Sequence, residues 1–150
     1  MVLVHATCIA LDGVGLLLRG PAGSGKSDLA LRLIDGGARL VADDQVDLRA
    51  DVARLIAAAP APIAGLLEVR GVGPLPVPAL SEVEVGLIVD LVPGHCIDRL
   101  PDPATCGYLG LQRPVLRLDP FQASAPAKLR LAVAAGVAGP LPPARPQHPA

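Results

Sequence analysis

The chain has 150 residues, which is room for one domain, and 51% of them are hydrophobic while 18% are charged. This composition is too apolar for an intrinsically disordered chain, and a net charge of −1 argues against an electrostatic grip on nucleic acid or on an anionic membrane. The aromatic residues are Tyr108 and Phe121, with no Trp, which disfavours a protein that stacks nucleic-acid bases on aromatic rings.

The first elements follow from local pattern. Val2–Ala10 predicts a strand, Asp12-Gly13 a hairpin turn and Val14–Arg19 a second strand. The segment from Ser27 to Ile34 has apolar residues at i, i+1, i+4 and i+5, the spacing of one helical face, and two glycines follow it. The pattern therefore predicts a hairpin, a Gly-rich loop and then a helix.

The second half of the chain predicts more strand than helix. A long connection is expected between Pro93 and Gly107, and the Pro-rich end predicts a tail without helix or sheet. The expected domain is 1–137 and the expected tail 138–150. The predicted elements are strands at Arg39–Ala42, Val46–Leu48, Leu66–Arg70, Val83–Val92 and Val115–Leu118, and a helix at Ala127–Ala135. Together they predict an α/β domain with a largely β sheet and few helices.

The location of the protein is predicted from what the sequence lacks. No apolar run reaches the roughly 18–20 residues of a membrane span, and Met1–His5 lacks the basic residues of a signal peptide. The three cysteines, an odd number without Cys-x-x-Cys spacing, are typical of reduced thiols. We expect a cytoplasmic protein with neither a membrane nor a nucleic acid as partner.

A phosphate-binding loop is the most specific motif. The run Gly20-Pro21-Ala22-Gly23-Ser24-Gly25-Lys26-Ser27 fits G-x-x-x-x-G-K-[ST] at every fixed position, between a predicted strand and a predicted helix. Glycines let consecutive backbone N–H groups point at phosphate oxygens, and the helix N-terminus adds partial positive charge. Lys26, one of only two lysines, would reach the β- and γ-phosphates, and the Ser27 hydroxyl would ligate Mg²⁺. The motif predicts binding of a nucleoside triphosphate and leaves the reaction open.

Asp43 and Asp44 follow a buried strand, at the kind of position where an open α/β sheet places its site. They are candidates for a metal-supporting carboxylate and for a base, or else for a surface turn. Glu68 and Arg70, in Glu-Val-Arg-Gly-Val-Gly, alternate onto one strand face. They are either a metal ligand with a phosphate clamp or a plain surface ion pair.

In order along the chain, these residues resemble the catalytic domain of HPr kinase/phosphorylase. The resemblance covers roughly residues 3–135. It rests on His5-Ala6, Gly13-Val14-Gly15, the loop at 20–27, Arg39 to Asp44, Leu67 to Val77 and Asp98-Arg99-Leu100. It implies a P-loop kinase core of the HPr kinase/PEP carboxykinase type. The implied activity is an ATP- and Mg²⁺-dependent serine kinase acting on the phosphocarrier HPr, with a regulatory role in carbon/nitrogen phosphotransferase signalling.

The resemblance also implies roles for single residues. Lys26 binds the phosphates, Ser27 and Glu68 hold Mg²⁺, and the pair Asp43/Asp44 contains the base that takes the serine proton, with a slight preference for the second. His5, Arg70 and Arg99 assist at the phosphate. Taken alone, a single His in a strand such as His5 is more often structural than catalytic, and a lone loop Arg such as Arg99 is usually just solvated.

The departures from the family pattern are as informative. The chain begins at the catalytic domain, as in short α-proteobacterial versions that lack the N-terminal domain, whereas full-length members are hexamers, which makes a homo-oligomer an open expectation. Asp119 to Pro126, where the family has a basic element, contains no Arg, which argues against a phosphorylase activity. Two alternatives stay open: a P-loop kinase for another acceptor, and a nucleotide-sensing module without turnover. With so few aromatics, adenine recognition is expected to rest on aliphatic contacts and backbone.

Overall fold

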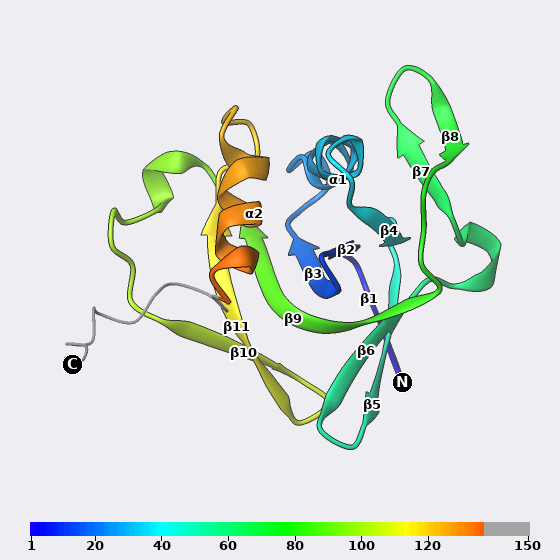
Figure 1. Ribbon diagram of the computed structural model, residues 1–150, viewed down its shortest axis with the longest axis horizontal. Helices are drawn as coiled ribbons and strands as arrows, with labels where there is room; N and C mark the ends of the chain where they lie inside the picture. The colour runs from blue at the N-terminus through cyan, green and yellow to red at the C-terminus, as the bar shows by residue number, and fades with distance from the viewer. Residues whose placement is uncertain (137–150) are drawn as a thin grey trace.

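The computed structural model describes residues 1–136, where two helices cover one face of a curved β-sheet (Figure 1). The helices are α1 (Lys26–Asp35) and α2 (Ala125–Ala134), and two short 3-10 turns are η1 (Ala61–Ile63) and η2 (Gly94–Cys96). The strands are β1 (Val2–Val4), β2 (Thr7–Leu11), β3 (Val14–Arg19), β4 (Arg39–Ala42), β5 (Val46–Asp51), β6 (Arg54–Ala58), β7 (Leu66–Val69), β8 (Gly73–Pro76), β9 (Glu82–Leu91), β10 (Ala104–Tyr108) and β11 (Leu111–Leu118).

The larger sheet has nine strands in the described residues, and its main path runs β1-β5-β6-β9-β3-β2-β4, with β11 and then β10 attached to β9. Strands β3, β9 and β11 are parallel, and β2 lies antiparallel between β3 and β4, so β4 is parallel to β3 as well. The carboxyl ends of β4, β3, β9 and β11 therefore share one edge of the sheet. An open α/β sheet binds its ligands at this edge.

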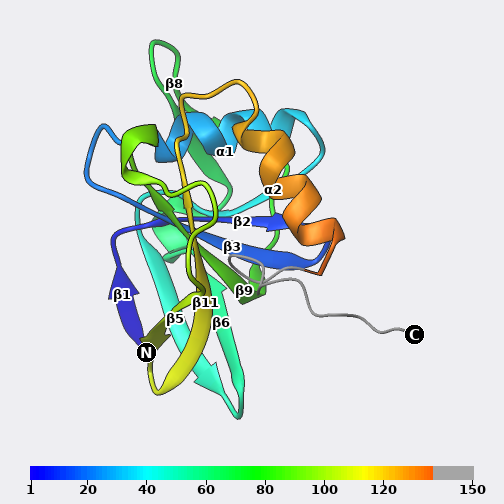
Figure 2. The ribbon, with the colours of Figure 1, turned by 90° about the vertical axis from the view of Figure 1, so that its left-hand side faces the viewer.

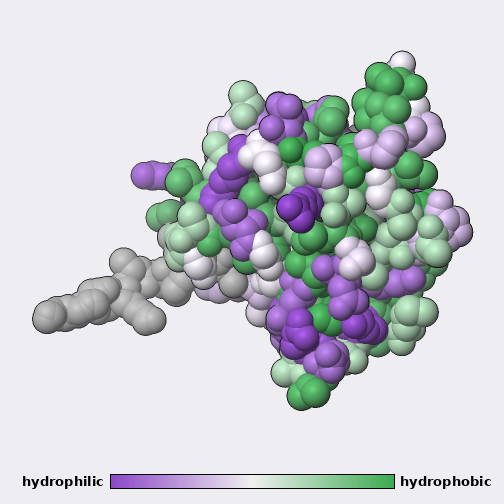
Figure 3. Space-filling view, turned by 45° about the vertical axis from the view of Figure 1, so that its right-hand side comes forward, coloured by the Kyte–Doolittle hydropathy of each residue, from purple (hydrophilic) through white to green (hydrophobic). Residues whose placement is uncertain are grey.

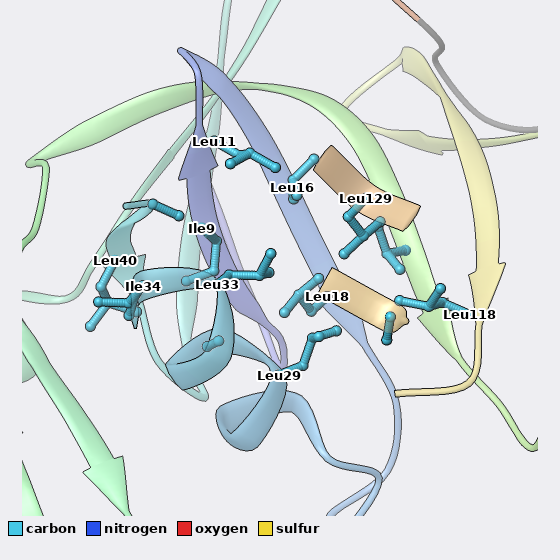
Figure 4. Close-up of a cluster of buried hydrophobic side chains, with 14 of the residues drawn as sticks. Ile9, Leu11, Leu16, Leu18, Leu29, Leu33, Ile34, Leu40, Leu118 and Leu129 are labelled. Atoms are coloured by element: carbon cyan, nitrogen blue, oxygen red, sulfur yellow. The ribbon is translucent and has the colours of Figure 1, made fainter. Parts of the chain in front are cut away.

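Both faces of the central strands are buried, because apolar residues fill successive positions rather than alternate ones. Ile9, Leu16 and Leu18 pack under the helices (Figure 4), while Cys8 and Leu17 face a second core. That second core lies between the central strands and the extension formed by β5, β6 and β11, which descends from the helical layer in Figure 2. Full burial raises the pKa of the Cys8 thiol to about 12.

Local signals place the elements around the phosphate loop as expected. The β2–β3 hairpin turns at Asp12 and Gly13, both with positive φ, as a two-residue turn requires. The predicted apolar face of α1 is buried against the sheet. The helix ends at Gly36, and Gly37 follows with φ +109°, a left-handed conformation that favours glycine.

Five details of the prediction are wrong at the level of elements. The single strand expected over Val2–Ala10 is two strands, because the chain breaks at His5–Ala6 and β1 joins β5 while β2 joins β3 and β4. The strands β6, β8 and β10 were not expected, since they contain alanine, glycine or proline and depend on pairing rather than propensity. Arg70 lies in the turn after β7, not in the strand.

The predicted tail at 138–150 lies outside the described residues, so the proposed domain boundary stays a prediction. Neither helix of the described chain combines the length and apolarity needed to cross a membrane.

Candidate active site

The phosphate loop connects β3 to α1 at the carboxyl edge of the sheet. Gly23 and Gly25 adopt φ +83° and +99°, which residues with a side chain rarely do, and the Ser24 N–H donates to the Pro21 carbonyl at 3.0 Å. Lys26 is 6% exposed, and its Nζ donates to the carbonyl oxygens of Gly20 at 2.6 Å and Pro21 at 3.1 Å. The ammonium group is thus held at the loop by neutral acceptors, beside the N-terminus of α1.

Asp43 directly follows β4 and is 7% exposed. Its Oδ1 accepts from the Ser27 hydroxyl at 2.9 Å and the Thr7 hydroxyl at 3.1 Å, and its Oδ2 accepts from the Glu68 backbone N–H at 2.9 Å. These donors satisfy a carboxylate that would otherwise be costly to bury. Asp43 therefore ties β2, α1 and β7 together beneath the phosphate loop.

Asp44 has the opposite surroundings, although it is the next residue. Its φ is +68°, its side chain is 61% exposed, and Oδ1 lies 3.4 Å from His5 Nδ1. The Asp44 N–H donates to Thr7 Oγ1 at 3.2 Å. Because the same Thr7 hydroxyl donates to Asp43, one buried side chain fixes the turn that separates the two carboxylates.

The hairpin of β7 and β8 forms one wall of the site and projects from the body of the molecule, as the lobe at the upper right of Figure 3. Its turn is closed by the Val72 N–H, which donates to the Val69 carbonyl at 2.9 Å, with Gly71 and Gly73 at positive φ. The Glu-x-Arg-Gly-x-Gly segment is therefore a tight turn. It presents Glu68 from the strand and Arg70 from the turn.

These elements enclose an open cavity of about 610 Å³, a volume typical of small-molecule and cofactor sites. The phosphate loop, the first two turns of α1, the β7–β8 hairpin, Asp44 and the turn after β11 contribute to it. The lining residues are Ala22, Gly23, Gly25, Lys26, Ser27, Asp28, Leu31, Asp44, Glu68, Val69, Arg70 and Phe121.

The structure brings most of the predicted site residues to this cavity, but not all of them. Gly20, Pro21 and Ser24 belong to the loop without lining the cavity. Asp43 does not line it either, but it accepts a hydrogen bond from Ser27, which does. His5 contacts Asp44 instead of lining the cavity. Arg99 is exposed in the connection between η2 and β10, away from the lining residues.

Several residues of the site were not predicted from the sequence, among them Thr7 and Phe121. Thr7 is one of only two threonines and the one polar side chain within a buried apolar strand, which is the signal that could have found it. Phe121 is one of the two aromatics, and it lines the cavity with 70% of its surface exposed. An aromatic ring therefore lines this cavity, while the expectation that adenine is recognised through aliphatic contacts and backbone stays a prediction.

The start of the loop is anchored by an ion pair. Arg19, the residue before Gly20, donates to the two oxygens of Asp90 at 2.7 and 2.8 Å and to the Tyr108 hydroxyl at 3.1 Å. The hydrogen bond to Asp90 is the main cause of a raised Arg19 pKa, so the guanidinium stays charged. This pair joins β3, β9 and β10 beside the loop.

The donor set also fits a magnesium ion. The Ser27 hydroxyl donates its hydrogen to Asp43, so the lone pairs of the Ser27 oxygen are available to a metal ion. Glu68 lines the same cavity. No cluster of three or more His, Cys, Asp or Glu side chains that could hold a metal occurs among residues 1–136. Mg²⁺ suits such a site, because it takes one or two protein ligands and completes its shell with water and phosphate.

Comparison with known proteins identifies the family of the chain. The model of the HPr Serine kinase C-terminal domain matches residues 1–86. The HPr kinase/phosphorylase of Clostridium acetobutylicum is 41% identical over 95 residues, covering 59% of this chain and 31% of that protein. The enzyme of the same name from Lactiplantibacillus plantarum is 39% identical over 108 residues, covering 65% and 34%.

A solved structure, the Hpr(Ser) kinase/phosphatase from Coxiella burnetii, matches with a TM-score of 0.81 at 30% identity, covering 91% of this chain and 96% of that chain. The chain spans about a third of the length of the curated relatives, 31% and 34% for the two named. The α/β fold with a largely β sheet is confirmed. The chain belongs to the family of the HPr serine kinase C-terminal domain.

Proposed function

We propose that this domain binds ATP with Mg²⁺ and transfers the γ-phosphate to a serine of an HPr-type phosphocarrier protein. One observation carries the proposal. The buried carboxylate of Asp43 holds the Ser27 hydroxyl at the phosphate loop, while the adjacent Asp44, which also lines the cavity, has an exposed carboxylate. A metal-holding hydroxyl and a proton acceptor thus flank one loop, which is the arrangement that phosphoryl transfer requires.

Phosphate binding is assigned to the loop, Lys26 and Arg70. The acceptors of the Lys26 ammonium are backbone carbonyls, and an anionic phosphate oxygen is a stronger partner for the same group. Arg70 is exposed at the cavity wall, where its guanidinium can bind phosphate with two parallel hydrogen bonds. These groups position the triphosphate at the N-terminus of α1.

Ser27 and Glu68 would hold Mg²⁺, and the role of Asp43 is to orient Ser27. When bound, the ion neutralises charge on the β- and γ-phosphate oxygens. The Glu68 backbone N–H donates to Asp43, so the same carboxylate that aligns the serine also fixes the strand position of Glu68.

Asp44 is assigned as the base, because its carboxylate is exposed where the serine of a protein acceptor can reach it. It accepts the hydroxyl proton as the serine oxygen attacks the phosphorus. His5, whose Nδ1 lies 3.4 Å from Asp44 Oδ1, orients that carboxylate. A role for Arg99 at the phosphate rests on the family resemblance alone, because its side chain does not line the cavity.

The proposed reaction runs in the kinase direction. The segment from Asp119 to Pro126 has no Arg. The cations that contact this segment donate to the segment itself: Arg32 to the Pro120 and Gln122 carbonyls and Lys128 to the Gln122 side chain. They are engaged and do not form a clamp for inorganic phosphate, which supports a kinase without phosphorylase activity.

Transfer of labelled phosphate from ATP to purified HPr tests the proposal, with Asp44→Asn as the decisive variant. Asp12→Asn is the matched control, because Asp12 is also an exposed aspartate with positive φ, at +51°, and it does not line the cavity. We expect transfer to be lost in Asp44→Asn and kept in Asp12→Asn.

Undiminished transfer by an Asp43→Asn/Asp44→Asn double variant would refute the mechanism. Phosphorylation of another acceptor instead of HPr would identify a P-loop kinase of different specificity, and ATP binding without transfer to any acceptor would identify a nucleotide sensor. Sedimentation of the same samples measures the assembly of the chain into a homo-oligomer.

A further inference from the structure

Phe121 is an exposed aromatic ring at the cavity that the proposed catalytic groups do not use. Its ring packs on the phosphate loop: a Cβ built on Gly25 would lie 3.2 Å from Phe121 Cζ and 3.2 Å from Pro120 Cγ. With 70% of its surface exposed in a chain of two aromatics, the ring is placed at the loop without being part of the core.

The order of the strands indicates which part of a bound nucleotide would lie beside the Phe121 ring. The acidic pair follows β4, the phosphate loop follows β3, and Phe121 follows β11, all at the same edge of the sheet. Asp44 and Phe121 therefore stand on opposite sides of the loop. On the proposed function, the γ-phosphate faces Asp44, so the ribose and base extend toward the end of β11.

The turn that carries the ring is held in place from three directions. Asp119 Oδ1 accepts from the Phe121 N–H at 3.0 Å. Arg32, on α1, donates to the carbonyl of Pro120 and, at 3.4 Å, to that of Gln122, whose side chain accepts from Lys128 at 2.8 Å. Because the backbone that carries the ring is already ordered, little backbone entropy is lost on binding.

We propose that Phe121, supported by Pro120, is the platform on which the purine base of the nucleotide stacks. This inference rests on the proposed function for the direction of the triphosphate. Every purine has a π-face, so stacking contributes affinity without reading the hydrogen-bonding edge of the base. The platform therefore accepts ATP and GTP comparably, and it contributes nothing to the binding of a triphosphate that lacks a base.

Calorimetric titration of the full chain with MgATP and with inorganic tripolyphosphate separates the base from the phosphates. Phe121→Ala should weaken ATP binding roughly tenfold, the order of one base–aromatic stack, and leave tripolyphosphate within about twofold. Leu131→Ala is the matched control, because Leu131 is an apolar residue with 71% exposure that does not line the cavity. It should change neither affinity.

Phe121→Trp gives a direct signal, because the chain has no other tryptophan. ATP should quench the indole fluorescence by stacking, and tripolyphosphate should not.

If Phe121→Ala weakened the binding of ATP and of tripolyphosphate equally, the platform would be overturned, and the role of the ring would be to hold the conformation of the phosphate loop. Unchanged ATP affinity would overturn it as well, by placing the base elsewhere. Failure of the wild-type chain to bind tripolyphosphate would overturn the proposed function, and the platform with it.

Discussion

The two sides of the phosphate loop are built on different principles. On the β4 side, Asp43 is fixed by side chains and one backbone N–H from three other elements, all buried or partly buried. On the β11 side, the turn around Phe121 is fixed by its own Asp119 and by cations that bond to it from the two helices. The first side depends on a buried or partly buried polar network, and the second mostly on exposed contacts, with only the Arg32–Pro120 bond partly buried.

This difference determines where substitutions should lower the free energy of unfolding most. A buried network fails as a unit, because removal of one partner leaves the others unsatisfied in a low-dielectric interior. Contacts at the surface exchange with water, so their loss is nearly neutral for folding. We therefore expect substitutions within the buried Asp43 network to affect stability and rate, and substitutions on the β11 side to affect mainly ligand affinity.

The largest contrast is expected between the two adjacent aspartates. Asp43→Asn should lower the free energy of unfolding by about 1–3 kcal/mol, because the neutral amide places an N–H among three donors. Asp44→Asn should change stability by less than about 0.5 kcal/mol, since its side chain is exposed, and still lower the transfer rate by about 10²–10⁴. Urea denaturation and initial rates measure the two effects; equal stability losses would break the contrast.

Thr7→Val tests whether the network positions the base. The two side chains are close in shape, but valine removes the hydroxyl that joins Asp43 to the Asp44 backbone. We expect a loss of about 1–2 kcal/mol in stability and a lower kcat, with little change in the KM for ATP, because the phosphate loop is untouched. Thr7→Ser should recover the rate, and a serine variant as slow as the valine variant would contradict the positioning role.

Arg32→Ala tests the β11 side with a smaller effect. The loss of its bonds to the Pro120 and Gln122 carbonyls should loosen the turn and weaken ATP binding a few-fold, with stability changed by less than about 1 kcal/mol. Tripolyphosphate binding should be unaffected. The control is Arg39→Ala, which removes an exposed arginine at the start of β4. If Arg32→Ala lost as much stability as Asp43→Asn, the turn around Phe121 would belong to the buried network.

The smallest effect is a difference in thiol reactivity. Cys8 is fully buried beside Thr7 in β2, and burial raises its pKa to about 12, so almost no thiolate is present at neutral pH. Cys96 is exposed. A thiol reagent should modify Cys96 at once and Cys8 only when the β4 side opens, which mass spectrometry of the labelled peptides can follow. Rapid modification of Cys8 in the folded chain would show that this side is less closed than its burial indicates.

The parts of the site that were predictable from the sequence are those fixed by local pattern. The phosphate loop is a contiguous motif with an apolar strand before it and an amphipathic helix after it, and each part requires only near neighbours. Glu68 and Arg70 were also found from their segment, although the strand was expected to continue through Arg70. The structure instead turns there, because Gly71 and Gly73 allow positive φ.

The rest depends on contacts between distant segments. Which aspartate is buried follows from the approach of Thr7 and Ser27, 36 and 16 residues away from Asp43. The break between β1 and β2 and the strands β6 and β10 depend on pairing partners. Phe121 reaches the loop because the chain folds back after β11, and a single aromatic residue in a Pro-containing loop gives no local sign of that return.

Strand β9 has a consequence for cooperativity. It pairs with β6 in its first residues and with β3 and β11 further along, so it belongs to both apolar layers of the protein. Neither layer can therefore open alone without breaking the same strand. Amide protons at its centre, from Leu87 to Val89, should exchange only through global unfolding, and chemical denaturation should report one transition for a chain that has two hydrophobic cores.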